Sequence, residues 1–472
     1  MTLLATLVAL AHAAPTVPVR TVPSPTPAAA ASSEDVALAR MRDAVSRADW
    51  DEAARLATAF PAAFPASPNL REAAYTARRA AARVVPDMRK LLVLLPLTGE
   101  MAVPAGRLRD AIRMAAEPGL SVEVVDTHGD PAACVAALES GVLDGGASLV
   151  LGPLRKEEAA TCAPAAQALR VPMITLTSSA EGLAAGDHVF RGYPSVEQQI
   201  AALLDAAMQV HGLRRFAVVH PQTAYGESAA TLFESAVRAR GGEIAIRLGY
   251  ASGQKDYLAV ARQLGRKDFQ GRASELRAIK KAITKEGGNA EKATLPPVVD
   301  YEGLFVPDGY QPTALLAAAL AFEEFPIGAF VPRRGERPVR LLGLAAWNNE
   351  DFVRRGAAYV RDSMFVDAFL ASSADPTVLD FVDAWRARGV GEPTMMDAVG
   401  YDLGRLARVV ADGGGGLAGL RAARLLASVS GLEGFGEDRQ ALRHYRVLTI
   451  GETGVALLPP PGAVEPETGS PP

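Results

Sequence analysis

Short apolar runs alternate with amphipathic stretches over most of the chain. Beginning at residue 90, each apolar run is followed within a few residues by a stretch with helical spacing of its apolar positions. The runs are KLLVLLPL, SVEVVD, ASLVLG and VPMITL, and the helical stretches cover about 104–116, 131–143 and 156–169. Strands that are apolar throughout and separated by helices are typical of right-handed βαβ units. The pattern therefore predicts a parallel sheet covered by helices.

The same alternation starts again after residue 195. Strands are predicted at RRFAVVH, GEIAIRLGY, YEGLFVP and PVRLLGL, with helices over about 196–211, 227–240, 257–264 and 312–322. Two consecutive units of this kind predict an α/β protein with two doubly wound parallel-sheet lobes. In such sheets, ligand sites lie beyond the carboxyl ends of the strands.

Residues 34–86 have a different pattern, that of helices alone. VALARMRDAV and DEAARLATAF have apolar residues at helical spacing, and DWDE is a helix-start signal. Three prolines between 61 and 68 interrupt the pattern before LREAAYTARRAAARV resumes it. The segment looks like one and a half tetratricopeptide-type units, although a plain helical hairpin fits as well. Such arrays need about three units to stand alone, so we expect this one to pack on the main body or on a partner.

The two ends of the chain have compositions that do not suit a packed core. MTLLATLVALAHA has a short apolar stretch and an A-x-A pattern, which predicts a signal peptide over 1–13. A buried N-terminal segment fits less well, because residues 14–33 are rich in Pro and Ala and read as a linker. Residues 461–472 read as a disordered tail. No later stretch has the roughly 18 apolar residues of a spanning helix. We therefore expect a periplasmic or otherwise extracytoplasmic protein, soluble after signal cleavage and without direct membrane insertion.

Charge and motif content exclude several function classes. The 472 residues carry a net charge of −4, which argues against a nucleic-acid partner. No common nucleophile, phosphate-loop or zinc motif occurs, and the six histidines are scattered. We expect neither catalysis, nor a cofactor, nor a metal site. Residues 265–297 form a lysine-rich insert, which is either an exposed surface excursion or a docking face for an acidic partner or polymer. Its lysines are Lys267, Lys280, Lys281, Lys285 and Lys292.

An ordered set of motifs resembles the leucine/isoleucine/valine-binding family of type I periplasmic binding proteins. The set is LLVLLPLTG, DTHGDPAACVAAL, LVLGPL, VPMITLTSS, HVFRGYPS, VVHPQTAYGES, LFVPDGY, LLGLAAW and FVDAWRAR…EPTMMDAVGYDLGRLARVV. The resemblance implies three crossings between lobes, with 88–194 plus 368–433 forming lobe 1 and 195–367 plus 434–460 forming lobe 2. It also implies a non-catalytic component of an ABC importer for amino acids, amides or related small polar solutes, working with a membrane permease.

The helical segment and the lysine-rich insert suggest a second resemblance. Penicillin-binding-protein activators are similar in architecture, with this two-lobed fold behind a helical-repeat domain. That resemblance implies a regulator that contacts a peptidoglycan synthase instead of a permease.

The first resemblance implies a ligand-binding set in the interlobe cleft. Thr177, Ser178 and Ser179 match the family's carboxylate-binding loop, although an ordinary helix cap would use the same residues. Tyr225 matches a cleft tyrosine and Tyr310 falls where another is expected; both would also suit the edge of a lobe. Thr98, at the end of the first strand motif, completes the matching set.

Two loops depart from the family pattern. The family has small hydroxyl residues after the LGPL strand, where this chain has Arg155 followed by Lys-Glu-Glu. It has an acidic residue after the LLG strand, where this chain has LAAW, ending at Trp347. Losing a charged hydrogen-bond partner costs about 1.5–3 kcal/mol. We therefore expect a ligand other than a plain branched-chain amino acid, with Arg155 favouring an anionic group and Trp347 either stacking on a flat ligand or filling the cleft.

The chain has two cysteines, Cys134 and Cys162. An even pair in an exported chain suggests a disulfide, and two buried free thiols are the alternative. The predicted helices that carry them follow the second and third strands, so they should be neighbours on one face of the sheet. We predict a Cys134–Cys162 bridge.

Overall fold

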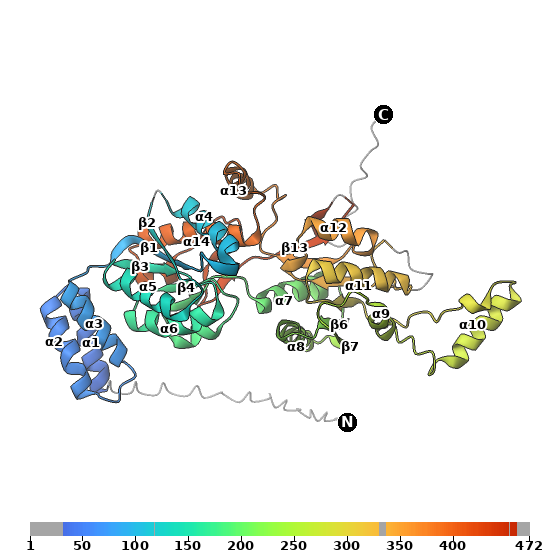
Figure 1. Ribbon diagram of the computed structural model, residues 1–472, viewed down its shortest axis with the longest axis horizontal. Coiled ribbons are helices and arrows are strands. Elements are labelled where there is room, and N and C mark those ends of the chain that lie inside the picture. The colour runs from blue at the N-terminus through green and yellow to red at the C-terminus, as the bar shows by residue number, and fades with distance from the viewer. Residues whose placement is uncertain (1–31, 118, 330–336, 453, 460–472) are drawn as a thin grey trace, which may run out of the picture.

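The computed structural model describes residues 32–117, 119–329, 337–452 and 454–459. The predicted signal peptide, nearly all of the predicted linker and the predicted tail lie outside these residues. The rest of the chain forms a helical segment, a first α/β lobe and a second α/β lobe, arranged in a row (Figure 1). The predicted fold class, two parallel-sheet lobes preceded by helices, is confirmed.

Three helices form the N-terminal segment: α1 (Ser33–Ser46), α2 (Trp50–Ala63) and α3 (Leu70–Ala82). Ser32 and Asp35 form a capping box at the start of α1, which satisfies two backbone N–H groups. Pro61 lies in the last turn of α2 and does not interrupt it, contrary to the sequence-based prediction. α3 packs on two helices of the first lobe, so the short segment gains a neighbour on the main body.

A five-stranded parallel sheet of order β2-β1-β3-β4-β5 carries the first lobe. Its strands are β1 (Asp87–Leu95), β2 (Ser121–Asp126), β3 (Ala147–Leu151), β4 (Met173–Thr175) and β5 (Val189–Arg191). Its helices are α4 (Ala102–Ala116), α5 (Pro131–Leu143), α6 (Lys156–Leu169), α13 (Pro376–Arg386), α14 (Met395–Asp412) and α15 (Gly416–Ala422), and β11 (Leu432–Phe435) and β12 (Ala441–Arg443) form a separate hairpin. Side chains alternate along β1: Leu91 and Val93 pack with α4 and α14, whereas Leu92 and Leu94 pack with α5 and α6.

The second lobe has a seven-stranded sheet of order β14-β13-β10-β9-β8-β6-β7. Its strands are β6 (Arg215–Pro221), β7 (Glu243–Tyr250), β8 (Gly303–Phe305), β9 (Arg340–Gly343), β10 (Met364–Asp367), β13 (Arg446–Ile450) and β14 (Val455–Leu457). The last two run antiparallel to their neighbours and close one edge. One face is covered by α7 (Val196–Leu204) and α8 (Ala224–Ala239), and the other by α9 (Leu258–Leu264), α11 (Tyr310–Phe322) and α12 (Glu350–Gly356).

The chain crosses between the lobes three times. The crossings are residues 192–195, between β5 and α7, residues 368–375, between β10 and α13, and residues 444–445, between β12 and β13. The third crossing comes later than the predicted return at residue 434. The reason is that β12 pairs with β11, and Gln440 bridges to Arg191 of β5, which keeps this stretch with the first lobe.

Two half-buried arginines, Arg443 and Arg446, connect the crossings by hydrogen bonds. Arg443 donates to the carbonyl of Gly192 at 2.9 Å and to the carbonyl and hydroxyl of Ser430, both at 2.5 Å. Arg446 donates to the carbonyl of Ala368 at 2.7 Å. The third crossing is therefore fastened to the other two, which makes the connection between the lobes a single hydrogen-bonded unit.

The lysine-rich insert carries α10 (Ala273–Lys285), which projects from the end of the second lobe that is remote from the first (Figure 1). No residue of α10 is buried. Lys267 is different: it is 6% exposed, and its Nζ lies 2.8 Å from Oε2 of Glu323, whose Oε1 accepts from Arg262 at 2.9 Å. Lys267 therefore anchors the base of the insert and does not belong to an exposed basic face.

Within the described ranges, no helix is long and apolar enough to cross a membrane.

Candidate ligand-binding site

A pocket of about 280 Å³ lies between the two lobes at the carboxyl ends of their strands. The first lobe contributes the loop after β4 and the first residue of α6. The second lobe contributes the first turn of α7 and the first half of α8. The lining residues are Lys156, Thr177, Ser178, Ser179, Val196, Glu197, Tyr225, Ser228, Ala229 and Leu232. Four of the eight predicted ligand-binding residues meet here.

The loop after β4 is held by its own hydrogen bonds and by a buried arginine. Thr177 is buried, and its hydroxyl accepts from the N–H of Ser179 at 3.2 Å. Arg191, only 3% exposed, donates to the carbonyl of Ser178 at 2.7 Å. Ser178 itself is exposed, and no side-chain hydrogen bond is formed by its hydroxyl in the described structure. The loop thus presents a free hydroxyl on a backbone that is held by hydrogen bonds.

Tyr225 and Ser228 face this loop from α8. Thr223 caps the helix by accepting from the N–H of Gly226 at 3.1 Å. A Cβ at Gly226 would lie 2.2 Å from the carbonyl oxygen of Pro221, so only glycine allows the first turn to sit this close to the end of β6. Tyr225 is 50% exposed at that turn, which leaves its ring available to a ligand.

An acidic group lies near Tyr225, at the end of β8. Asp308 accepts from the hydroxyl of Tyr250 at 2.6 Å and from the N–H of Gly309 at 2.7 Å. Burial and the charge of Asp308 raise the pKa of Tyr225. The resemblance implies an acidic residue after β9, where this chain has none, and Asp308 was not among the predicted ligand-binding residues. The signal was the LFVPDGY motif, in which Asp308 follows a buried strand.

Four predicted ligand-binding residues lie elsewhere. Trp347 is fully buried, packs against Phe352 at a ring distance of 5.2 Å, and donates to the carbonyl of Asp308 at 3.0 Å. It fills the core of the second lobe, so its predicted ligand contact is wrong in this structure. Tyr310 is part-buried on α11, with its hydroxyl 3.4 Å from Asp351.

Thr98 and Arg155 belong to the loops of the first lobe outside the pocket. Thr98 is exposed, with its hydroxyl 2.9 Å from Nδ1 of His128. The guanidinium of Arg155 lies over Gly129: a Cβ added to Gly129 would be 2.9 Å from Nη1 of Arg155. The basic side chain in the pocket is instead the next residue, Lys156.

The two cysteines are free thiols in the structure, so the predicted disulfide is not formed there. Cys134 lies on α5 and Cys162 on α6, the two neighbouring helices that were predicted to carry them. Both are fully buried. The hydrogen bond between the two thiols and their burial raise the pKa of Cys134, which keeps it protonated and slow to oxidise.

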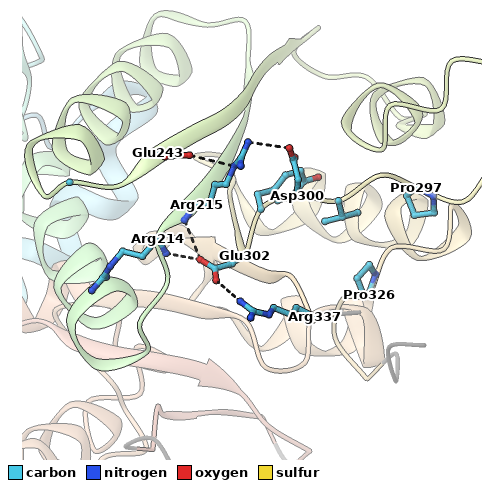
Figure 2. A pocket seen from close by; sticks show the side chains of 11 residues that line it. Arg214, Arg215, Glu243, Pro297, Asp300, Glu302, Pro326 and Arg337 are labelled. Atoms are coloured by element: carbon cyan, nitrogen blue, oxygen red, sulfur yellow. Dashed lines mark hydrogen bonds and ion pairs between the residues drawn. The ribbon is translucent and has the colours of Figure 1, made fainter. Parts of the chain in front are cut away.

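A larger pocket, of about 690 Å³, lies at the amino ends of the strands of the second sheet, where β6, β7 and β8 begin (Figure 2). Its charges neutralise one another: Arg215 pairs with Asp300 at 3.1 Å and lies 3.7 Å from Glu243, and Glu302 accepts from Arg337 at 3.4 Å. A lining whose charges are paired offers little to a charged ligand, and ligands of such sheets bind at the carboxyl ends. The smaller interlobe pocket is therefore the better candidate.

Two doubly wound lobes, three crossings and a pocket between the lobes give this chain the fold of the type I periplasmic binding proteins. Residues 90–271 match the family model described as periplasmic binding protein. No curated protein matches the chain. Among solved structures, the chain is similar to a putative branched-chain amino acid ABC transporter protein from Rhodospirillum rubrum, with 19% identity and a TM-score of 0.62 over 78% of this chain and 99% of that one.

Two further solved structures have the same fold. The leucine-binding protein of Thermotoga maritima is 18% identical, with a TM-score of 0.52 over 78% of this chain and 97% of that one. A solute-binding protein from Rhodopseudomonas palustris HaA2, in complex with p-hydroxybenzoic acid, is 17% identical, with a TM-score of 0.54 over 78% and 94%. At these identities the likeness establishes the fold and leaves the ligand of this chain open.

Proposed function

We propose that the protein is a non-catalytic, extracytoplasmic solute-binding component of an ABC importer, and that it holds a small carboxylate-bearing solute such as an amino acid, an amide derivative or a related polar acid. The observation that carries this proposal is the interlobe pocket, where the hydroxyls of the loop after β4 face Tyr225 of α8. Isoleucine and p-hydroxybenzoic acid, the ligands of two similar structures, both carry one carboxylate.

The lining suits one anionic end and one polar end of a solute. On the first lobe, the hydroxyls of Ser178 and Ser179, the amino end of α6 and the charge of Lys156 favour a carboxylate. On the second lobe, Tyr225 and Glu197 line the pocket and can accept or donate to an ammonium, amide or hydroxyl group. A solute that contacts both lobes favours their approach, because it gains its second set of contacts only when the lobes close.

Native mass spectrometry of the freshly purified protein tests the proposal first. A co-purified solute should appear as an added mass that is released by unfolding. Thermal unfolding should then be measured with leucine, glutamine and 4-hydroxybenzoate, because a ligand present at 100 times its dissociation constant stabilises the folded state by about 2.7 kcal/mol. No added mass, together with no stabilisation by a broad panel of small carboxylates, would contradict the proposal.

A matched pair of variants connects any binding to the pocket. Ser178→Ala removes an exposed hydroxyl of the pocket and should weaken a bound carboxylate about tenfold or more, since a hydrogen bond to a charged group contributes about 1.5–3 kcal/mol. Thr161→Ala removes an exposed hydroxyl on the side of α6, outside the pocket, and serves as the control. Equal affinities for the two variants would mean that the solute binds elsewhere.

A second candidate function rests on the projecting helix α10. Because its side chains are unburied and it carries Lys280, Lys281 and Lys285, it fits a docking role towards an acidic partner. This would suit the penicillin-binding-protein activator type of regulator, acting on a peptidoglycan synthase by protein contact. Replacing the three lysines with glutamate should then abolish capture of a purified synthase while leaving any effect of small carboxylates unchanged. Undiminished capture would rule this role out for α10.

A further inference from the structure

A third cavity, of about 200 Å³, lies where the helical segment meets the first lobe. Helices α1 and α3 form one wall, and the ends of α5 and α6 form the other. Its apolar floor includes Leu143 and Leu169, and the hydroxyls of Ser46 and Thr76 lie among its polar groups. The cavity is at the carboxyl end of α6, whereas the interlobe pocket is at the amino end, about 20 Å away for a helix of this length.

Three arginines line this cavity, and only one of them has an acidic partner. Arg42 forms a two-pronged ion pair with Glu72, in which Nε lies 2.6 Å from Oε1 and Nη2 lies 2.8 Å from Oε2. Glu72 is 5% exposed and the side chain of Arg42 is 38% exposed, so this pair is half-buried. Within the described residues, the side chains of Arg79 and Arg170 form no hydrogen bond or ion pair.

The two arginines without an acidic partner, Arg79 and Arg170, lie on opposite walls of the cavity. Arg79 lies in the last turn of α3, and Arg170 ends α6 in the left-handed conformation, with φ of +54°. Burial lowers the pKa of both guanidinium groups, and the charge of Arg42 contributes to the lowering for Arg170. Asp187 offsets part of this positive charge, but its carboxylate is already held by Gln167, His188 and Arg421.

Arg79 is half-buried and Arg170 is exposed, and the positive charge that they and Arg42 gather around one cavity attracts an anion. The arginine fork matches the oxygens of phosphate and carboxylate groups, and several forks on different walls match a tetrahedral oxyanion best. A single carboxylate would neutralise one arginine and leave the other unpaired. The apolar floor leaves room for an ester group attached to the oxyanion.

We propose that this cavity binds a phosphate-type oxyanion, either inorganic phosphate or the phosphoryl group of a larger molecule, between Arg79 of α3 and Arg170 at the end of α6, with Arg42 beside them. Such an anion would connect the helical segment to the first lobe. Binding would therefore fasten the segment to the body of the protein, independently of any solute in the interlobe pocket.

Calorimetric titration of the full chain with inorganic phosphate at low ionic strength tests the proposal. The wild type should bind one phosphate, and Arg79→Gln and Arg170→Gln should each bind it at least tenfold more weakly. Arg55→Gln is the control for net charge, because Arg55 is exposed on α2 and pairs with Glu52. Glycerol 3-phosphate and vesicles with or without phosphatidylglycerol distinguish free phosphate from an ester or a lipid headgroup as the source.

Thermal unfolding gives a second readout that does not depend on finding the best ligand. Without an anion, Arg79→Gln should unfold at a temperature equal to or above that of the wild type, because a half-buried charge without an acidic partner has been removed. In phosphate the order should reverse, because only the wild type gains the ligand. The proposal is overturned if phosphate, glycerol 3-phosphate and anionic vesicles all fail to bind, or if Arg79→Gln and Arg55→Gln bind them equally.

Discussion

We expect Asp367 to make the stability of the connection between the lobes depend on pH. It ends β10 at the second crossing and is 2% exposed. Its carboxylate accepts from the amide of Asn348 at 2.8 Å and from the N–H groups of Ala368 at 2.6 Å and Phe369 at 3.4 Å. Burial nevertheless outweighs these hydrogen bonds and the charge of Arg446, and raises the pKa of Asp367 to about 7.

The raised pKa determines the sign of the effect. The folded protein holds the proton of Asp367 more tightly than the unfolded chain, in which the pKa is 3.8. The resulting stabilisation is fully present below pH 3.8 and is lost as the pH rises through about 7. At roughly 1.4 kcal/mol per pH unit, this interval corresponds to about 4 kcal/mol of unfolding free energy.

Urea unfolding between pH 4 and pH 8, followed by tryptophan fluorescence, measures this loss when wild type is compared with Asp367→Asn. Trp347 is close to the site through its neighbour Asn348. The stability of the wild type minus that of the variant should fall by about 4 kcal/mol from pH 4 to pH 8. Asp380→Asn, at an exposed position of α13, is the matched control. A difference that stays constant with pH, or that grows in favour of the wild type as the pH rises, would refute the reasoning.

Three other predictions concern packing and bonding. Oxidation of Cys134 and Cys162 to a disulfide should stabilise the first lobe by about 3 kcal/mol. Alkylation in denaturant with and without reductant, followed by mass spectrometry, identifies the oxidised form. An unfolding midpoint that is the same for the oxidised and reduced forms would contradict the predicted stabilisation. Gly226→Ala should destabilise the second lobe by about 1–3 kcal/mol and weaken solute binding, measured by urea unfolding and calorimetry; wild-type values for both would contradict the close approach at α8. Lys267→Met should cost about 3 kcal/mol, because it removes one partner of the buried Glu323; a loss below about 0.5 kcal/mol in urea unfolding would show that Arg262 alone satisfies Glu323.

The fold could be predicted from the sequence because its strands are buried on both faces. A strand such as β1 has to be apolar at Leu91 and Leu92 alike, since neighbouring residues face different helix layers. Such a run stands out against the amphipathic helices on either side. The third crossing was harder to place, because it depends on the pairing of β12 with β11 and on the bridge at Gln440, which no local pattern reveals.

Half of the predicted ligand-binding residues line the interlobe pocket, and the reason lies in backbone position. Thr177, Ser178 and Ser179 lie in the loop that follows β4, and Tyr225 lies in the first turn of α8 shortly after β6, so the ends of the strands determine where they lie. Arg155 also follows a strand closely, but its long side chain has several directions available, and it lies over Gly129 instead of in the pocket.

Trp347 lies in the loop where the family has an acidic residue, and it contacts the loop that carries Asp308. A Cβ at Gly343 would lie 2.2 Å from the indole ring, so the end of β9 leaves a space that only the ring occupies. From there, the indole N–H reaches the carbonyl of Asp308, and this bond helps to hold the loop after β8 whose carboxylate lies near Tyr225. This chain lacks the family's acidic residue after β9, and Asp308 follows the adjacent strand β8. Because β8 and β9 are paired, their carboxyl ends lie at the same edge of the sheet. An acidic residue in the loop after either strand therefore lies near the same site.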